Sequence, residues 1–216
     1  MKREKEISII GGADGPTSIF LAGGFSNAKK PVKERIRNRV YLWKKKRVEK
    51  KIHANPHTLK QTVEAAQRKY HAVELPKTTR TYKEQRQSAK EGMIFQNKPE
   101  LLGELAEIKP PDVWNEHTAK EMLRLADLRS RKAASVPDSE MPMDFHVYII
   151  KIKGGRMELQ IDFHWELFGM SYSGDAKAMK KLKKLGRRLY CFYGVSAADM
   201  ENKTERYQSL VAALSG

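Results

Sequence analysis

The tripeptide Asp-Phe-His occurs twice in the chain, at residues 144–146 and 162–164. Carboxylates and imidazoles serve as metal ligands and as general acids and bases, so the repeat points to a metal or catalytic site. The flanking residues, however, alternate like two strands joined by a tight turn at residues 154–155. In that hairpin His146 would pair with Phe163, and the two imidazoles would point to opposite faces. We therefore expect ordinary strand residues here and no metal site.

The remaining reactive side chains lack the neighbours that catalysis requires. Arg187 and Arg188 would lower the thiol pKa of an exposed Cys191, but we favour a small buried thiol at this position. Ser171 and Ser173 lie in a glycine-rich segment without the G-x-S-x-G pattern of a nucleophile elbow. The sequence thus offers no catalytic constellation, and we expect a non-enzymatic protein without a cofactor.

Residues 7–24 form the most unusual stretch of the chain, ISIIGGADGPTSIFLAGG, in which Asp14 is the only carboxylate. A Walker loop would need a lysine after its last glycine, where Pro16 and Thr17 stand. A strand, a turn and a short helix that begins at Pro16 fit the pattern. Backbone amides at such a helix start can bind an anion, although Asp14 opposes this and favours capping. A poorly ordered N-terminal leader is the other interpretation.

The core of this stretch resembles a signature of the beta subunit of sodium-ion-translocating, biotin-dependent decarboxylases, the integral-membrane part of these pumps. The matching residues are Gly11, Gly12, Ala13, Asp14, Gly15, Pro16 and Thr17. The resemblance implies that Asp14 would carry the coupling cation, sodium, and that the glycines let backbones approach one another. Such a pump needs many apolar spans of about 20 residues, which this chain lacks. We therefore expect an accessory or binding protein that bears the motif without the pump.

Residues 7–28 are also a poor membrane span, and no other segment is a candidate. Small or polar residues fill half of this stretch, and an aspartate near the bilayer centre costs roughly 3 kcal/mol. The single cysteine excludes an internal disulfide, and the N-terminus lacks a secretory signal pattern. We expect a soluble cytoplasmic protein. A membrane-associated fragment of a decarboxylase is a further alternative.

The chain carries 42 lysines and arginines against 26 acidic residues, a net charge of +16. Such a charge attracts an anionic partner: nucleic acid, an acidic protein or anionic lipid. A nucleic-acid-binding protein is the alternative to the accessory function, and an ordinary solvated face is the simpler explanation of the charge. The side chains expected to contact the anion are Lys44, Lys45, Lys46, Arg47, Lys50, Lys51, Lys180, Lys181, Lys184, Arg187 and Arg188.

The spacing of apolar residues predicts an α+β, predominantly helical fold in three parts. Residues 1–28 are the glycine-rich leader. Residues 29–134 are a basic helical region whose first two helices should pair as antiparallel neighbours. Residues 141–216 are a strand-strand-helix-helix unit, with one apolar and one wetter sheet face, a loop over residues 169–174 and a helix over residues 175–190. That helix resembles the last helix of double-stranded-RNA-binding domains, a fold that needs three strands where the sequence indicates two.

Overall fold

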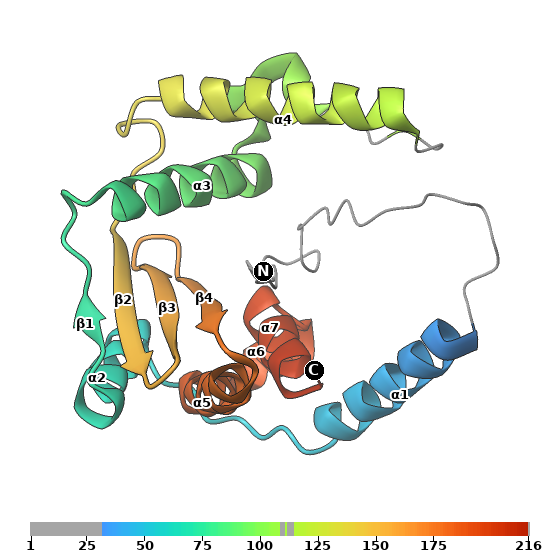
Figure 1. The fold of residues 1–216 in the computed structure, drawn as a ribbon, viewed down its shortest axis with the longest axis vertical. Coiled ribbons are helices and arrows are strands. Elements are labelled where there is room, and N and C mark those ends of the chain that lie inside the picture. Colours follow the sequence, from blue (N-terminus) through green and yellow to red (C-terminus); the bar gives the residue numbers. More distant parts are fainter. Residues whose placement is uncertain (1–31, 109–110, 112–114, 216) are drawn as a thin grey trace. The chain divides into compact units, whose positions relative to one another are not determined.

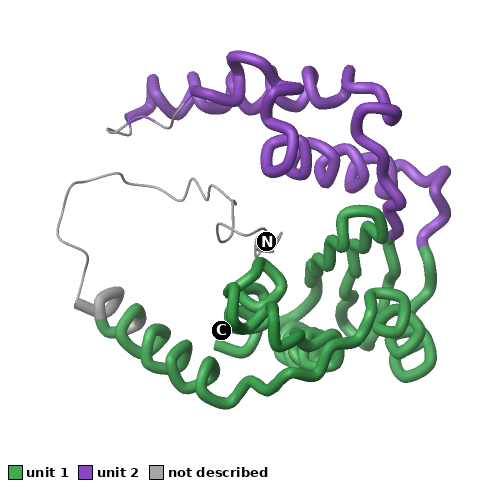
Figure 2. The backbone as a smooth tube through the Cα atoms, turned by 180° about the vertical axis from the view of Figure 1, so that it is seen from behind, with its two compact units in different colours: residues 1–21, 28–74, 147–216 green, residues 22–27, 75–146 purple. Residues whose placement is uncertain are grey.

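The computed structural model describes residues 32–108, 111 and 115–215. They form a predominantly helical α+β protein with one four-stranded antiparallel sheet, which confirms the predicted fold class (Figure 1). The chain divides into two compact units. Within the described part, unit 1 holds residues 32–74 and 147–215, and unit 2 holds residues 75–146 (Figure 2). This division runs through the expected helical region of residues 29–134. The first part of that region, residues 32–74, folds together with the C-terminal strands.

The sheet has the strand order β1-β2-β3-β4. The strands are β1 (Val73–Glu74), β2 (Phe145–Ile152), β3 (Gly155–Asp162) and β4 (Leu167–Gly174). The predicted hairpin of β2 and β3 is confirmed, but its turn lies one residue earlier than expected, at residues 153–154, because Gly155 already belongs to β3. Gly154 adopts a φ of 84° in this turn. The expected loop over residues 169–174 is wrong, because these residues belong to β4, which pairs with β3 along its whole length.

The short strand β1 comes from a distant part of the sequence. It pairs with β2 in antiparallel register, with Val73 opposite Ile149 and Glu74 opposite Tyr148. Residues 75–144, between these two strands, belong to unit 2, which also includes the start of β2. Unit 2 therefore interrupts unit 1 between two strands that lie side by side.

The helices of unit 1 begin and end at recognisable signals. They are α1 (Val32–Glu49), α2 (Leu59–Tyr70), α5 (Ala176–Tyr193), α6 (Ala197–Asn202) and α7 (Glu205–Ser215). Thr58 and Gln61 form a capping box at the start of α2, and Ser196 and Asp199, at the same three-residue spacing, form another before α6. The single last helix that the sequence suggested is divided into α6 and α7 at Lys203, which has a left-handed backbone.

Helices α2 and α5 cover one face of the sheet and enclose the main core of unit 1 (Figure 1). The predicted apolar face is confirmed, and its buried members from β2 and β3 are Tyr148, Ile150, Met157, Leu159 and Ile161. Phe168 and Met170 of β4 complete this face, and Leu182 and Leu189 of α5 pack onto it. The opposite face is less exposed to solvent than expected, since Glu158 and Asp162 are both buried there.

A second, smaller core joins the remaining helices of unit 1. Ile52, just after α1, and Val195, just after α5, are buried with Tyr207, Leu210 and Val211 of α7. Helix α1 packs against α7 and does not form the antiparallel pair with α2 that the sequence suggested. The segment after α1 runs along the end of α5, where the backbone amides of Asn55 and His57 donate hydrogen bonds to the carbonyl oxygens of Val195 and Tyr193.

Unit 2 consists of α3 (Arg80–Asn97), a 3-10 helix η1 (Pro99–Ala106) and α4 (Glu116–Ser135). Lys90 of α3 is buried, and its ammonium donates hydrogen bonds to Val136 O at 2.5 Å and to Asp138 Oδ1 at 3.0 Å. Arg86 binds the other carboxylate oxygen of Asp138 at 2.6 Å. These contacts fasten the loop after α4 to α3.

Candidate anion-binding surface

Helix α5 presents a continuous positive surface. Its inward positions are apolar or small, namely Ala178, Leu182, Gly186 and Leu189, and all four are buried. Its seven basic residues are exposed: Lys177, Lys180, Lys181, Lys183, Lys184, Arg187 and Arg188. The 18-residue helix contains no acidic residue, and none of the carboxylates in the described part of the chain forms a salt bridge with these cations. The charge is therefore unneutralised on this face.

Contacts at the start of α5 and on its inner side fix the orientation of the helix, and therefore the side on which its basic residues face solvent. Asp175 caps the helix, and its Oδ1 accepts hydrogen bonds from the backbone amides of Lys177 and Ala178 at 2.9 and 2.7 Å. Gly186 allows α5 to lie close to β4, because a side chain at this position would overlap the hydroxyl of Tyr172. The helix is thus held tightly by one side, while its opposite side faces solvent.

The second predicted set of basic residues lies on helix α1 and in the turn that follows it. Lys44, Lys45, Lys46, Arg47, Lys50 and Lys51 are all exposed, as the prediction of an anion contact requires. The apolar residues of this helix recur at helical spacing, which predicts a buried stripe, but Ile36, Val40 and Trp43 are exposed along most of its length. Only its C-terminal end reaches a core, through half-buried Val48 and through Ile52.

The two basic sets meet at a groove in unit 1. It has a volume of about 630 Å³ and lies among α1, α5, α7 and the segment after α1. Its apolar lining comes from Trp43, Val48, Ile52, Leu210 and Leu214. Its cations are Lys44, Arg47, Lys51 and Arg187, and none of the described residues that line it is acidic. We refer to it as the α1–α7 groove.

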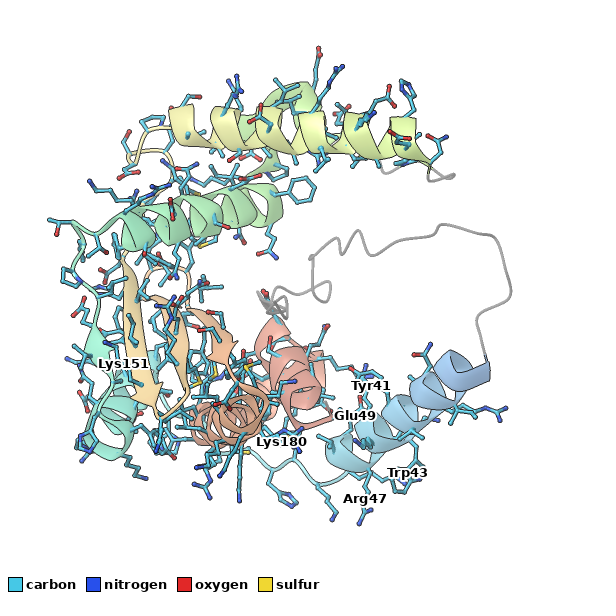
Figure 3. The ribbon with its side chains drawn as sticks, viewed as in Figure 1. Tyr41, Trp43, Arg47, Glu49, Lys151 and Lys180 are labelled. Carbon is cyan, nitrogen blue, oxygen red and sulfur yellow. The ribbon has the colours of Figure 1, made fainter. Side chains whose placement is uncertain are left out.

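Trp43 and Arg47 line the groove together. The Arg47 guanidinium lies over the Trp43 ring, 5.4 Å from its centroid, and 60% of Trp43 is exposed. Figure 3 shows these two side chains on one side of α1, and Tyr41 and Glu49 on the other. Glu49, the carboxylate nearest to this part of the chain in sequence, is thus directed away from Trp43 and Arg47.

The structure separates the other predicted anion contacts from the groove. Lys45 and Lys46 of α1 and Lys50, just after it, do not line the groove. Lys180 lies on the outer surface of α5 (Figure 3). Sequence reasoning missed the part that α7 plays, because nothing in the sequence indicates that Leu210 packs next to α1. The exposed tryptophan within a basic helix was the one visible signal.

Cys191 lies at the groove and differs from the expectation of a buried thiol. Its side chain is exposed, at the C-terminal end of α5. Partial desolvation raises the pKa of this thiol, so the neighbouring Arg187 does not make it a reactive thiolate. Cys191 therefore contributes a small, weakly polar surface to the groove.

The two Asp-Phe-His segments make local contacts. His146 Nε2 lies 2.9 Å from Asp144 Oδ1, and the buried Asp162 accepts hydrogen bonds from the backbone amides of His164 and Trp165. The second aspartate thus shapes the turn between β3 and β4. In residues 32–108, 111 and 115–215, no three histidine, cysteine or acidic side chains are grouped as metal ligands.

The decarboxylase-like motif falls outside the described residues. Asp14, the proposed cation ligand, and the motif residues Gly11, Gly12, Gly15, Pro16 and Thr17 therefore keep the status of predictions. Among the helices that are described, none has the length and apolar character needed to cross a membrane.

No family model, curated protein or solved structure matches the chain. What the α5 surface and the α1–α7 groove do is therefore inferred from their own chemistry. Both combine exposed cations with an absence of acidic neighbours in the described part of the chain, and the groove adds an aromatic and aliphatic lining. This chemistry suits a polyanion with flat apolar parts.

Proposed function

We propose that this protein is a non-enzymatic, cytoplasmic nucleic-acid-binding protein and that double-stranded RNA is its ligand. The observation that carries the proposal is the outer face of α5, where seven exposed cations lie on one helix without an acidic residue. Binding to a phosphate backbone requires such positive charge, and releasing condensed counterions supplies much of the binding free energy.

The spacing along α5 suits a duplex. Lys177, Lys180, Lys181, Lys184 and Arg188 recur at helical intervals of three and four residues, so they share one side of the helix. With a rise of 1.5 Å per residue, this row is about 16 Å long. A rigid row of this length can contact phosphates on both sides of a groove, which is how proteins read the shape of an RNA helix.

The topology of unit 1 supports RNA over other polyanions. The lysine-rich helix α5 follows three consecutive antiparallel strands, β2, β3 and β4, and α2 shares with it the same face of the sheet. The order of these elements along the chain is similar to that of double-stranded-RNA-binding domains. The sequence alone had indicated only two of the three strands. Unit 2, inserted between α2 and β2, is an addition to that arrangement.

A salt series with matched charge reversals tests the proposal. The test variant is Lys180→Glu, Lys181→Glu and Lys184→Glu, and the control is Lys83→Glu, Arg124→Glu and Lys132→Glu, three exposed residues of unit 2. Both variants have the same net charge. The dissociation constant for a blunt 20-base-pair RNA is measured by fluorescence anisotropy at several salt concentrations.

The α5 variant should bind much more weakly than wild type. The magnitude of the slope of log association constant against log salt concentration should fall by about 2 to 3, since roughly 0.7 to 0.9 counterions are released for each phosphate contact. The control should retain the wild-type slope. Equal affinities of the two variants, or binding that does not depend on salt, would refute the proposal. Preferential binding to anionic vesicles would assign the surface to lipid instead.

A further inference from the structure

The α1–α7 groove continues the positive surface of α5. Arg187 belongs to both, since it is one of the seven exposed cations of α5 and also lines the groove. Lys44, Arg47 and Lys51 extend the charge along the other side of the groove. A phosphate backbone that lies on α5 can therefore pass Arg187 and enter the groove without meeting an acidic side chain among the described residues.

The lining of the groove differs from that of α5, because it is largely apolar. Val48, Ile52, Leu210 and Leu214 contribute aliphatic surface, and Trp43 contributes an exposed ring. Phosphate contacts alone need no such lining, so its ligand has an apolar part as well as a negative charge. An unpaired nucleotide has both, because its base is flat and apolar on its faces and its phosphate is anionic.

From these observations we propose that the α1–α7 groove binds unpaired nucleotides at the end of the RNA duplex that occupies α5. This inference rests on the proposed function and specifies its ligand as a duplex with a single-stranded tail. A base stacks on Trp43, whose ring is held by Arg47, and the phosphates of the tail contact Lys44, Lys51 and Arg187. Exposed aromatic side chains among cations bind single-stranded nucleic acid in this way.

The size of the groove fits this ligand. Its volume of about 630 Å³ lies within the range of roughly 300–1,000 Å³ that is typical of small-molecule sites. This leaves room for a nucleotide together with a neighbouring phosphate. An acidic amphipathic helix and the acyl chain of an anionic lipid are the competing occupants, but neither explains why the groove shares Arg187 with a surface suited to duplex phosphates.

Tailed and blunt RNA duplexes separate this inference from the proposed function. Anisotropy titrations compare a blunt 20-base-pair RNA with the same duplex carrying a three-nucleotide tail at either the 5′ or the 3′ end. One tail nucleotide is 2-aminopurine, whose fluorescence falls when it stacks. Wild type is compared with Trp43→Ala, Trp43→Phe and a control, Leu123→Ala, which removes a similarly exposed side chain from α4.

We expect a tail at one end to increase the wild-type affinity roughly tenfold and to quench 2-aminopurine, as stacking of a single base would do. Trp43→Ala should lose this increase and the quenching while it binds the blunt duplex like wild type, and Trp43→Phe should retain part of both. Leu123→Ala should behave like wild type. Far-ultraviolet circular dichroism checks that each variant is folded.

Three results would overturn the inference. If wild type binds tailed and blunt duplexes with equal affinity, the groove does not bind unpaired nucleotides, and the proposed function stays intact. A tail effect that survives Trp43→Ala would place the tail elsewhere. Binding of an acidic helical peptide or of anionic vesicles that depends on Trp43, together with no tail effect, would assign the groove to that ligand. Absence of salt-dependent binding to any of the duplexes would instead refute the proposed function.

Discussion

The guanidinium of Arg206 lies over the ring of Tyr193, with 3.8 Å between its central carbon and the ring centroid. It also donates hydrogen bonds to three carbonyl oxygens, at 2.8 Å to Gly194, 2.7 Å to His57 and 2.5 Å to Tyr193. One side chain of α7 therefore holds together the end of α5 and the segment that follows α1. The two helices that line the α1–α7 groove with α7 are positioned through this residue.

Replacing Arg206 should destabilise unit 1. Lysine in Arg206→Lys cannot reach three carbonyls with a planar fork or stack on Tyr193 in the same way. Hydrogen bonds to charged groups contribute about 1.5–3 kcal/mol each, so we expect a loss of roughly 2–3 kcal/mol in the free energy of unfolding, measured by urea denaturation. Arg188→Lys, on the exposed side of α5, should change it little. Equal stabilities of the two variants would contradict this account.

Two glycines should respond to alanine with opposite signs. A side chain at Gly92 in α3 would meet nothing within 4 Å, so Gly92→Ala should stabilise the protein by about 1 kcal/mol through helix propensity. Gly186→Ala gains the same propensity but forces α5 away from Tyr172 and Met170. Overpacking costs about 1–3 kcal/mol, and we expect a net loss in thermal unfolding. A stabilising Gly186→Ala would show that α5 has room against β4.

Acid should weaken unit 2 through Asp138. Its hydrogen bond with Lys90, with a further contribution from Arg86, holds the carboxyl pKa below the ordinary value of 3.8. A lowered folded-state pKa contributes stability that is present above the unfolded-state pKa and is lost as the pH falls through the folded one. Urea unfolding of wild type should therefore weaken more steeply below about pH 4 than that of Asp138→Asn.

The control for this pH dependence is Asp127→Asn. Asp127 pairs with Arg131 at 2.8 Å on the exposed surface of α4, and such surface pairs contribute little. This variant should follow the wild-type pH dependence. If it flattens the acid limb as much as Asp138→Asn does, the loss arises from general surface charge and not from the contact with buried Lys90.

Asp14 provides a test of the resemblance to decarboxylase beta subunits. If the motif binds sodium outside a membrane pump, wild type should melt at a higher temperature in sodium chloride than in choline chloride of equal ionic strength, since a ligand that binds only the folded state stabilises it. Asp14→Asn should abolish the difference, whereas Glu6→Gln should preserve it. The same response to sodium in all three proteins would leave the motif without a cation-binding role.

The sequence predicted the parts of unit 1 that depend on local periodicity. The alternation in β2 and β3 identified the buried face correctly, because a strand turns every second side chain toward the same side. The spacing of leucines in α5 likewise identified its exposed basic side, and Ser196 with Asp199 identified a helix start. Each of these signals is complete within a few neighbouring residues.

Strand β4 was missed because its composition is that of a loop. Gly169, Ser171 and Ser173 suggest a turn, yet they alternate with Phe168, Met170 and Tyr172, whose side chains reach the core. Gly169 and the two serines occupy the other face, where they oppose residues of β3. The alternation of large apolar with small residues was the better indication of a strand here, because a strand accommodates small residues on one face.

The α1–α7 groove could not be predicted from local patterns. Its residues come from the end of α1 and the segment after it and from α5 and α7, and α7 begins more than 150 residues after α1 ends. The apolar residues of α1 indicated a buried stripe, but only its last turn reaches a core. Which helix packs against α1 depends on how the rest of unit 1 folds, and the sequence of α1 does not contain that information.

The pairing of β1 with β2 makes the whole of unit 2 equivalent to the loop of a β-hairpin. Glu74 and Tyr148 are directly opposed, so the chain leaves unit 1 and returns to it at adjacent positions. Residues 75–147 thus stand where an ordinary β-hairpin has a turn of a few residues. Residues gained or lost in this insertion therefore leave the chain order of α2, α5 and the segments that line the groove unchanged.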